Sequence, residues 1–230
     1  MKFGGKTCLI TGAAGNLGRA VAKAFASEGA SLILLDHAEE HLRSAYGAPG
    51  DGKRFAIADL RDAESVARAI PPGTRIDILC NIAGGFRMGE PVHETSDDTW
   101  DLMLGLNARS VINCARAVVP GMLAAGGGKI INIGAVAALS GKANMAAYIA
   151  SKAAVIRLTE SMAAELREKS INVNCVLPGT IDTPQNRKDM PKADPRRWVA
   201  PEALADVILF LASDAARAIH GASIPVAGLS

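Results

Sequence analysis

The segment GAVAALSGKANMAAYIASK, residues 134–152, carries the pair of side chains best suited to chemistry. Tyr148 and Lys152 are separated by three residues, so on a helix they lie on one face about one turn apart. A free tyrosine loses its proton near pH ~10, and a cation about one turn away stabilises the phenolate. The spacing therefore predicts a phenol that donates a proton and a lysine that lowers the phenol's pKa.

Short apolar runs that alternate with longer helical patterns must position this pair. The runs typical of strands are residues 6–11, 30–36, 53–59, 76–84, 128–134, 171–179 and 222–228. They are nearly continuous Val, Ile, Leu and Ala, as in a parallel sheet covered by helices on both faces. We expect an α/β fold with a doubly wound parallel sheet of the Rossmann type, forming a single domain over residues 1–230. Residues 179–200 are rich in Pro, Asp, Asn and Arg and are predicted to form a substrate lid.

Composition and charge narrow the classes of partner. The chain has 230 residues, is 49% apolar and carries a formal net charge of +2, which suits one core and favours neither nucleic acid nor a membrane surface as a partner. Small molecules are the expected ligands. The first residues lack an apolar signal segment, and no run approaches the length of a membrane span, so a cytoplasmic location is expected.

The cysteines and histidines suggest no metal site. The cysteines are far apart, without a CxxC pair or a nearby histidine, and are expected to be buried free thiols in a reducing compartment: Cys8, Cys80, Cys114 and Cys175. The histidines form no visible cluster in the sequence and receive no role: His37, His41, His93 and His220. No metal ion is therefore expected.

A glycine-rich turn follows the first strand. In TGAAGNLGRA, residues 11–20, Gly12, Gly15 and Gly18 recur every three residues before a helix. Glycines there permit a tight turn and a close approach of a pyrophosphate to backbone N–H groups at the positive end of the helix. The alternative is a purely structural turn. We assign the turn, with Asn16 and Leu17, to a dinucleotide.

Polar and small residues at the next strand ends extend this assignment. Asp36 ends the second strand, where a carboxylate can accept hydrogen bonds from ribose hydroxyls and repel a 2'-phosphate, so NAD(H) is expected over NADP(H). Its alternative role is a helix or turn cap. Asp59 and Leu60 are further candidates, which would hold an adenine edge or cap a helix. Asn81, Ala83 and Gly84 would contact the nucleotide or form an ordinary strand exit.

Together these motifs resemble the short-chain dehydrogenase/reductases over essentially the whole chain. TGAAGNLG, Asp36, NIAGG, Asn107, YIASK and PGTIDT occur in that family's order. The resemblance implies that Tyr148 is the general acid/base, that Lys152 binds the nicotinamide ribose, and that Asn107 holds a water of the proton relay. Asn107 bridging a helix kink, and Tyr148 and Lys152 as a surface pair, are the alternatives. The PGTIDT segment would supply further cofactor contacts through Pro178, Gly179, Ile181 and Thr183, and the family likeness implies a homodimer or homotetramer.

One family residue is missing. The family carries a serine thirteen residues before this tyrosine, and that position is Ala135 here. Ser140, Asn144 or a bound water are the candidate replacements. The quinonoid dihydropteridine reductases work without this serine, and the chain resembles them in its GxxGxxG spacing, in its tyrosine segment and in residues 181–198. A quinonoid pterin is already electron-poor, so its reduction needs a proton but less polarisation of a carbonyl.

Other features oppose a simple transfer of that substrate. The segment around Asn107 resembles bacterial ketone and acyl reductases instead, and Phe86 and Trp198 are the only obvious aromatics near the site. On the lid, Asn186 and Arg187 would recognise a polar substrate or form an exposed turn.

Three functions remain open. The first is an NADH-dependent reductase of a quinonoid dihydropterin or a similar electron-poor imine or quinone, with Tyr148 as proton donor. The second is a ketone or alcohol oxidoreductase. The third is a non-catalytic protein that senses NAD(H), which the retained Asn107, Tyr148 and Lys152 disfavour.

Overall fold

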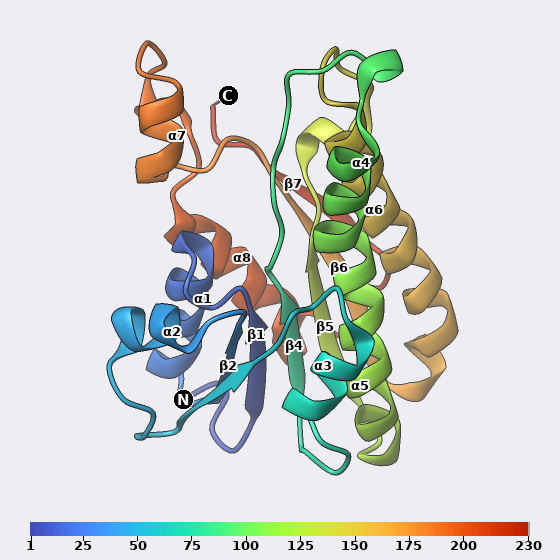
Figure 1. The fold of residues 1–230 in the computed structure, drawn as a ribbon. Helices are drawn as coiled ribbons and strands as arrows, with labels where there is room; N and C mark the ends of the chain where they lie inside the picture. Colours follow the sequence, from blue (N-terminus) through green and yellow to red (C-terminus); the bar gives the residue numbers. More distant parts are fainter. Residues whose placement is uncertain (230) are drawn as a thin grey trace.

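The computed structural model describes residues 1–229, which form a parallel sheet between two layers of helices (Figure 1). The sheet order is β3-β2-β1-β4-β5-β6-β7, and every neighbouring pair is parallel. The strands are β1 Thr7–Thr11, β2 Ser31–Asp36, β3 Lys53–Ile57, β4 Ile78–Asn81, β5 Gly128–Ile133, β6 Ile171–Pro178 and β7 Ser223–Val226. Each lies within a run that the sequence indicates as a strand, so the predicted doubly wound sheet is confirmed.

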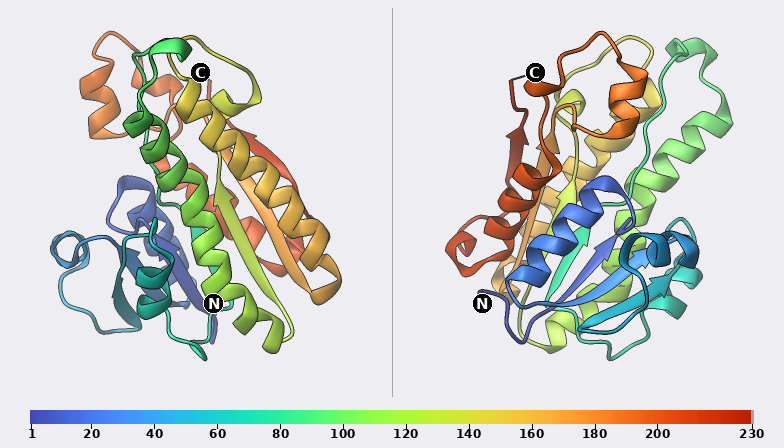
Figure 2. Two further views of the ribbon diagram at one scale, coloured as in Figure 1. Left: turned by 45° about the vertical axis from the view of Figure 1, so that its right-hand side comes forward. Right: turned by 90° about the vertical axis from the view of Figure 1, so that its left-hand side faces the viewer.

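The helices divide between the two faces of the sheet, as Figures 1 and 2 show. On one face lie α1 (Asn16–Ser27), α2 (Glu39–Tyr46) and α8 (Pro201–Ala212). On the other lie α3 (Ala63–Ala69), α4 (Asp97–Leu104), α5 (Ser110–Ala124) and α6 (Ala146–Leu166). A π-helical turn, η2 (Gly105–Arg109), joins α4 to α5. The 3-10 turns are η1 Val92–Glu94, η3 Val136–Leu139, η4 Arg167–Lys169, η5 Pro195–Arg197 and η6 Asp214–Ala216.

The core lies on both sides of the sheet because successive strand residues point to opposite faces. In β1, Cys8 and Ile10 join the cluster under α1 and α8, whereas Leu9 joins the cluster under α3, α5 and α6. All three side chains are fully buried. Both faces therefore demand apolar residues, which explains why the strands read as continuous apolar runs.

The connections place a crevice at the carboxyl ends of β1 and β4. After β1 the chain builds outward through β2 and β3, and then returns to place β4 on the other side of β1. The loops after β1 and β4 diverge at this point, and a doubly wound sheet binds ligands outside the carboxyl ends of its strands there.

The segment predicted as a lid, residues 179–200, contains a short helix, α7 (Pro184–Asp189), and the 3-10 turn η5. Both views of Figure 2 place α7 at the same end of the molecule as the chain end marked C. Ile181 and Val199 pair as an isolated bridge, which closes the segment at its base.

Across residues 1–229, none of the helices combines the length and apolar character that crossing a membrane requires.

Candidate active site

In the glycine-rich turn, residues 12–18, close backbone packing leaves no room for a side chain at two of the glycines. Gly12 has a φ of +61°, and a Cβ there would lie 2.8 Å from the Cα of Ala83. A Cβ at Gly18 would lie 2.8 Å from the Cα of Ala13. At the start of α1, Gly15 is the N-cap without a side-chain cap bond, and the first turn has no acidic residue. Backbone N–H groups at a helix N-terminus thus remain for an anionic ligand.

A cleft of about 1050 Å³ opens beside this turn. It is lined by the turn's Gly12, Gly15, Asn16, Leu17 and Gly18 and by Asp36, Asp59, Leu60, Ala83, Gly84 and Thr183. All of these were predicted from the sequence as cofactor contacts. The backbone N–H donors of the glycine-rich turn and the size of the cleft fit a nicotinamide dinucleotide.

Asp36, at the carboxyl end of β2, is buried but faces the cleft. Its Oδ2 accepts a hydrogen bond from the backbone N–H of Ala14 at 3.0 Å, and Oδ1 accepts one from the N–H of His37 at 2.9 Å. The N-cap of α2 is Ala38, so Asp36 is not a helix cap. It fixes the glycine-rich turn against β2 and presents negative charge to the cleft.

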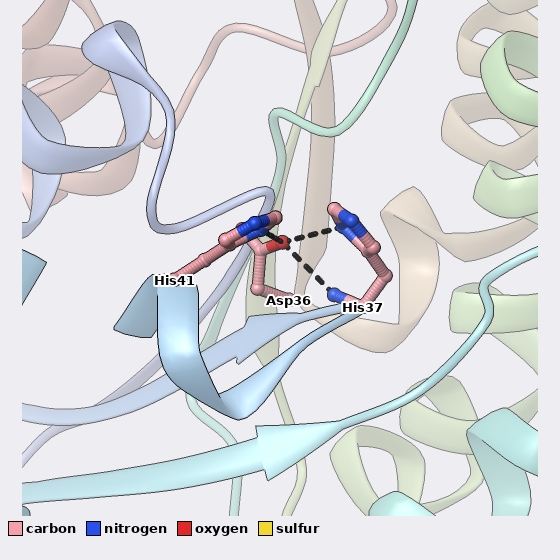
Figure 3. A group of neighbouring side chains, drawn as sticks. All are labelled: Asp36, His37 and His41. Atoms are coloured by element: carbon pink, nitrogen blue, oxygen red, sulfur yellow. Dashed lines mark hydrogen bonds and ion pairs between the residues drawn. The ribbon is translucent and has the colours of Figure 1, made fainter. Parts of the chain in front are cut away.

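The expectation that the histidines form no cluster is wrong. His37 and His41 lie on either side of Asp36, with ring centroids 4.8 Å apart (Figure 3). His37 lies just before the N-cap of α2 and His41 lies in its first turn, so both rings reach the carboxylate at the end of β2. Both line the cleft.

Asp59 and Leu60 have separate local partners. Asp59 accepts hydrogen bonds from the Arg61 guanidinium, at 2.7 Å from Nη2, and these bonds hold the pKa of the carboxyl below its usual range. Asp62, and not Asp59, caps α3. The carbonyl of Leu60 accepts from the side chain of Asn113 at 2.9 Å.

Asn81 does not line the cleft. Its side-chain amide donates to Oδ1 of Asn132 on β5 at 2.9 Å, and Asn132 donates in turn to Thr159 on α6 at 2.9 Å. The buried side chain of Asn81 therefore ties the sheet to α6.

Three catalytic candidates converge around α6. Tyr148 and Lys152 both lie on this helix, and Lys152 is buried with Nζ donating to the carbonyl of Ile133 at 2.8 Å. A Cβ at Gly84 would lie 2.6 Å from Oδ1 of Asn107 and 3.1 Å from Nζ of Lys152. Gly84 also lines the cleft. Because it has no side chain, nothing at this position separates the cleft from Asn107 and Lys152.

Asn107 lies in the π-helical turn and is 1% exposed. Its amide donates to Ser151 Oγ at 2.9 Å and to the Gly85 carbonyl at 3.1 Å, and its Oδ1 accepts from the Gly85 N–H at 2.9 Å. Ser151 Oγ donates to the Tyr148 carbonyl at 2.7 Å. Asn107 thereby joins the loop after β4 to α6. Its partner on α6, Ser151, is the residue before Lys152. The sequence analysis missed Ser151, although its place between Tyr148 and Lys152 was a signal.

The predicted lowering of the Tyr148 pKa is not found. Burial raises the pKa of Tyr148 to about 12, and burial lowers that of Lys152 to about 8. Desolvation disfavours the charged form of each group. For Lys152 it outweighs the opposing effect of the nearby Cys175 thiol. The Lys152 ammonium is bonded to the Ile133 carbonyl. At neutral pH the phenol is therefore protonated and the lysine remains mostly charged.

The segment after β5 contributes no hydroxyl at the family's serine position. Ala135 is buried there, and a Cβ on the preceding Gly134 would lie 3.1 Å from Cys175 Sγ. Ser140 and Asn144 are exposed in the loop between η3 and α6. Asn144 lines a separate hollow of about 140 Å³. Beside Tyr148, the ring of Phe86 packs edge-on at a centroid distance of 4.8 Å.

The lid uses its polar side chains internally. Arg187 forms an ion pair with Asp182, Nε to Oδ1 at 2.6 Å, and Asn186 donates to the Ile181 carbonyl at 2.8 Å. Thr183 lines the cleft while its Oγ1 accepts from the Asn186 N–H and caps α7.

The remaining predicted contacts lie at the base of the lid. Pro178 is buried at the end of β6, and the Gly179 N–H donates to the Val226 carbonyl at 3.0 Å. Trp198 is partly exposed at the end of η5, beside the C-terminal segment. Neither Pro178, Gly179 nor Ile181 lines the cleft.

Known proteins resemble this chain in sequence and in fold. Residues 6–194 match the family model described as short chain dehydrogenase. The chain is 38% identical to a 3-oxoacyl-acyl-carrier-protein reductase of Thermotoga maritima, across 99% of this chain and 98% of that protein.

Solved structures with similar folds include an NAD+-bound xylitol dehydrogenase, with a TM-score of 0.90, 30% identity and coverage of 99% and 100% of the two chains. They also include a gluconate 5-dehydrogenase of Burkholderia cenocepacia in complex with NADP and tartrate, with a TM-score of 0.90, 31% identity and coverage of 99% and 95%. The sequence match, the parallel sheet and the site place the chain in the short-chain dehydrogenase family, as an NAD(P)-dependent oxidoreductase.

Proposed function

We propose that this protein is an NADH-dependent reductase of an electron-poor conjugated imine or quinone, with a quinonoid dihydropterin as the candidate substrate. The observation that carries this proposal is Ala135. The site retains Tyr148, Lys152 and Asn107 but has an apolar, buried side chain where the family binds a substrate carbonyl.

The cleft supplies the contacts that a nicotinamide dinucleotide needs. Backbone N–H groups of the glycine-rich turn would receive the pyrophosphate, and Asp36 would accept hydrogen bonds from the adenosine ribose. The buried carboxylate of Asp36 would repel a 2'-phosphate, which supports NAD(H) over NADP(H). The cofactor, when bound, supplies a hydride.

The chain's own residues manage the proton. Tyr148, whose pKa burial raises to about 12, remains a phenol at neutral pH and donates its proton to the reduced nitrogen or oxygen. Lys152, held by the Ile133 carbonyl, stabilises the phenolate that results. Asn107 and Ser151 hold α6 and the loop after β4 in register around this transfer.

An electron-poor substrate explains why the serine is dispensable. A hydroxyl near a carbonyl oxygen stabilises charge that develops as the carbonyl is reduced. A quinonoid system delocalises that charge over its own ring, so it needs the proton of Tyr148 more than a second donor. The ring of Phe86 beside Tyr148 offers an apolar surface for a flat substrate.

A second function is favoured by one observation. The relative from Thermotoga maritima is named as a 3-oxoacyl reductase, and its identity of 38% extends over nearly the whole chain. On this reading the protein reduces a ketone, and Ser140, Asn144 or water replaces the missing hydroxyl.

Purified protein should be assayed for NADH oxidation with quinonoid dihydropterin generated in the cuvette, beside ketones and a 3-oxoacyl thioester. We expect pterin turnover in the wild type and none in Tyr148→Phe. Turnover of ketones alone would reject the pterin and support the second function. NADH binding without turnover of any substrate would favour the NAD-sensing alternative.

A further inference from the structure

Three potential metal-binding side chains converge at the carboxyl end of β2. Among the described residues, Asp36, His37 and His41 offer ligand atoms that all lie within 4.8 Å of one another. Nδ1 of His37 lies 2.8 Å from Oδ1 of Asp36, and Nδ1 of His41 lies 4.0 Å from the same oxygen. Figure 3 shows both rings directed at this carboxylate from the two sides.

The local chain geometry fixes one member and leaves the other two adjustable. The Asp36 carboxylate is held by the N–H groups of Ala14 and His37. The imidazoles are 70% and 51% exposed, so small rotations meet little steric resistance. The group thus has a rigid oxygen and two movable nitrogens.

We propose that Asp36, His37 and His41 bind one divalent transition-metal ion, with Zn²⁺ as the best-fitting ion. Zn²⁺ is bound by imidazole nitrogen and carboxylate oxygen at about 2.0–2.2 Å, which separates tetrahedral ligand atoms by about 3.3 Å. The observed separations of 2.8 and 4.0 Å fall on either side of that value. Two imidazoles and one carboxylate form a three-ligand set with one position open toward the cleft.

Neighbouring charges permit a cation here. The positive end of α2 is unfavourable to a cation, but Glu39 and Glu40 lie in its first turn and offset it. Arg43 is bound to Glu39 through an ion pair of 2.6 Å. Across the cleft, Arg61 is bound to Asp59. Arg19 is the remaining cation of the lining, and its guanidinium donates to Asn16 at 3.0 Å.

A metal ion at this position would affect the cofactor. The metal ion would bind a carboxylate oxygen of Asp36, and Asp36 also faces the cleft. Zn²⁺ and the adenosine ribose would therefore require the same carboxylate, so Zn²⁺ should compete with NADH. This consequence rests on the proposed function, whereas metal binding itself does not.

The first experiment tests binding without nucleotide. Metal-free full-length protein is titrated with ZnCl₂ by calorimetry, and one Zn²⁺ per chain is expected. His37→Ala and His41→Ala should each weaken binding by at least about tenfold, because a three-ligand site loses one ligand. His93→Ala is the matched control, since His93 is also exposed and is paired with the exposed Glu94. Melting curves verify that each variant folds.

Two results would overturn the site. Either no heat of binding is seen up to about 100 µM Zn²⁺, or the double variant His37→Ala/His41→Ala binds Zn²⁺ as tightly as the wild type.

The second experiment tests competition. NADH binding is followed by fluorescence with Zn²⁺ and with a chelator, and each variant is compared with its own value in chelator. Zn²⁺ should raise the apparent Kd for NADH at least about tenfold in the wild type and leave that of His41→Ala unchanged. Zn²⁺ binding with no change in NADH affinity would overturn the competition. Failure of NADH to bind even in chelator would reject the proposed function, and the zinc titration would still decide the metal site.

Discussion

The two ends of the site are built in different ways. At the cofactor end, backbone packing and hydrogen bonds set the geometry: a Cβ at Gly12 would meet Ala83, and Asp36 is bonded to the Ala14 N–H. At the substrate end, the lid is held by contacts within itself. Arg187 and Asn186 are bonded to Asp182 and Ile181 of the same segment, and Phe86 is 55% exposed.

The two ends of the site therefore differ in which of their properties relatives are expected to share. The cofactor end is built on the sheet, so relatives that keep the sheet and these strand-end residues keep the geometry of the nucleotide cleft. The substrate end depends on loop side chains, which can change without disturbing the core, and on the buried Ala135. Similarity over the whole chain therefore assigns an NAD(P)-dependent oxidoreductase and leaves the substrate to experiment.

The largest expected effect comes from Tyr148→Phe, which breaks the chemistry and spares the cofactor end. Removing the hydroxyl eliminates the proton donor, and turnover should fall by about 10² to 10⁴. The ring contact with Phe86 remains possible, so the fold should persist. Steady-state NADH oxidation and a fluorescence titration with NADH measure the two parts. A variant that keeps a large share of turnover would show that another group supplies the proton.

Asp36→Asn tests the cofactor end directly. The amide oxygen can still accept from the Ala14 N–H, but the charge that would repel a 2'-phosphate is gone. The ratio of kcat/KM for NADPH to that for NADH should rise about tenfold to a hundredfold. An equal loss with both cofactors, together with a lower Tm, would mean that Asp36 acts only in holding the glycine-rich turn.

The sequence predicts the cofactor end better than the substrate end for a physical reason. Tyr148 and Lys152 lie on one helix as expected, and the strands lie within the predicted runs, because buried elements impose a strong apolar pattern. The glycine-rich turn and Asp36 follow from strand ends in the same way. The cytoplasmic location and the homo-oligomer stay predictions.

Properties that depend on tertiary burial could not be predicted. The sequence places Lys152 one turn after Tyr148, but the direction of the Tyr148 pKa shift depends on desolvation, which only the packed site determines. The meeting of His37, His41 and Asp36 depends on where α2 begins. Likewise, Asn81 turns toward Asn132 in the sheet, which the strand sequence alone does not indicate.

The pH dependence of reduction tests the role of Lys152. Burial lowers its pKa to about 8, so the ammonium loses its proton at a lower pH than an exposed lysine does. Since the neutral amine no longer stabilises the phenolate, kcat/KM should fall about tenfold between about pH 7 and about pH 9. Any residual activity of Lys152→Arg should be independent of pH in this range, because a guanidinium keeps its charge. The same fall in both proteins would assign it to another group.

The smallest effect is expected from Ala135→Ser, which tests whether this position at the substrate end selects the substrate. A new hydroxyl would bond to a carbonyl oxygen that gains charge, and a hydrogen bond of about 1 kcal/mol corresponds to about fivefold in kcat/KM for ketones. Turnover of the quinonoid pterin should stay the same, because that substrate delocalises the charge itself. Ala135→Val adds volume without a donor at this buried position and serves as the control. Equal responses of ketones and pterin to the serine would show that Ala135 does not select the substrate, and the discrimination would then lie in the loop that carries Phe86 and in the lid.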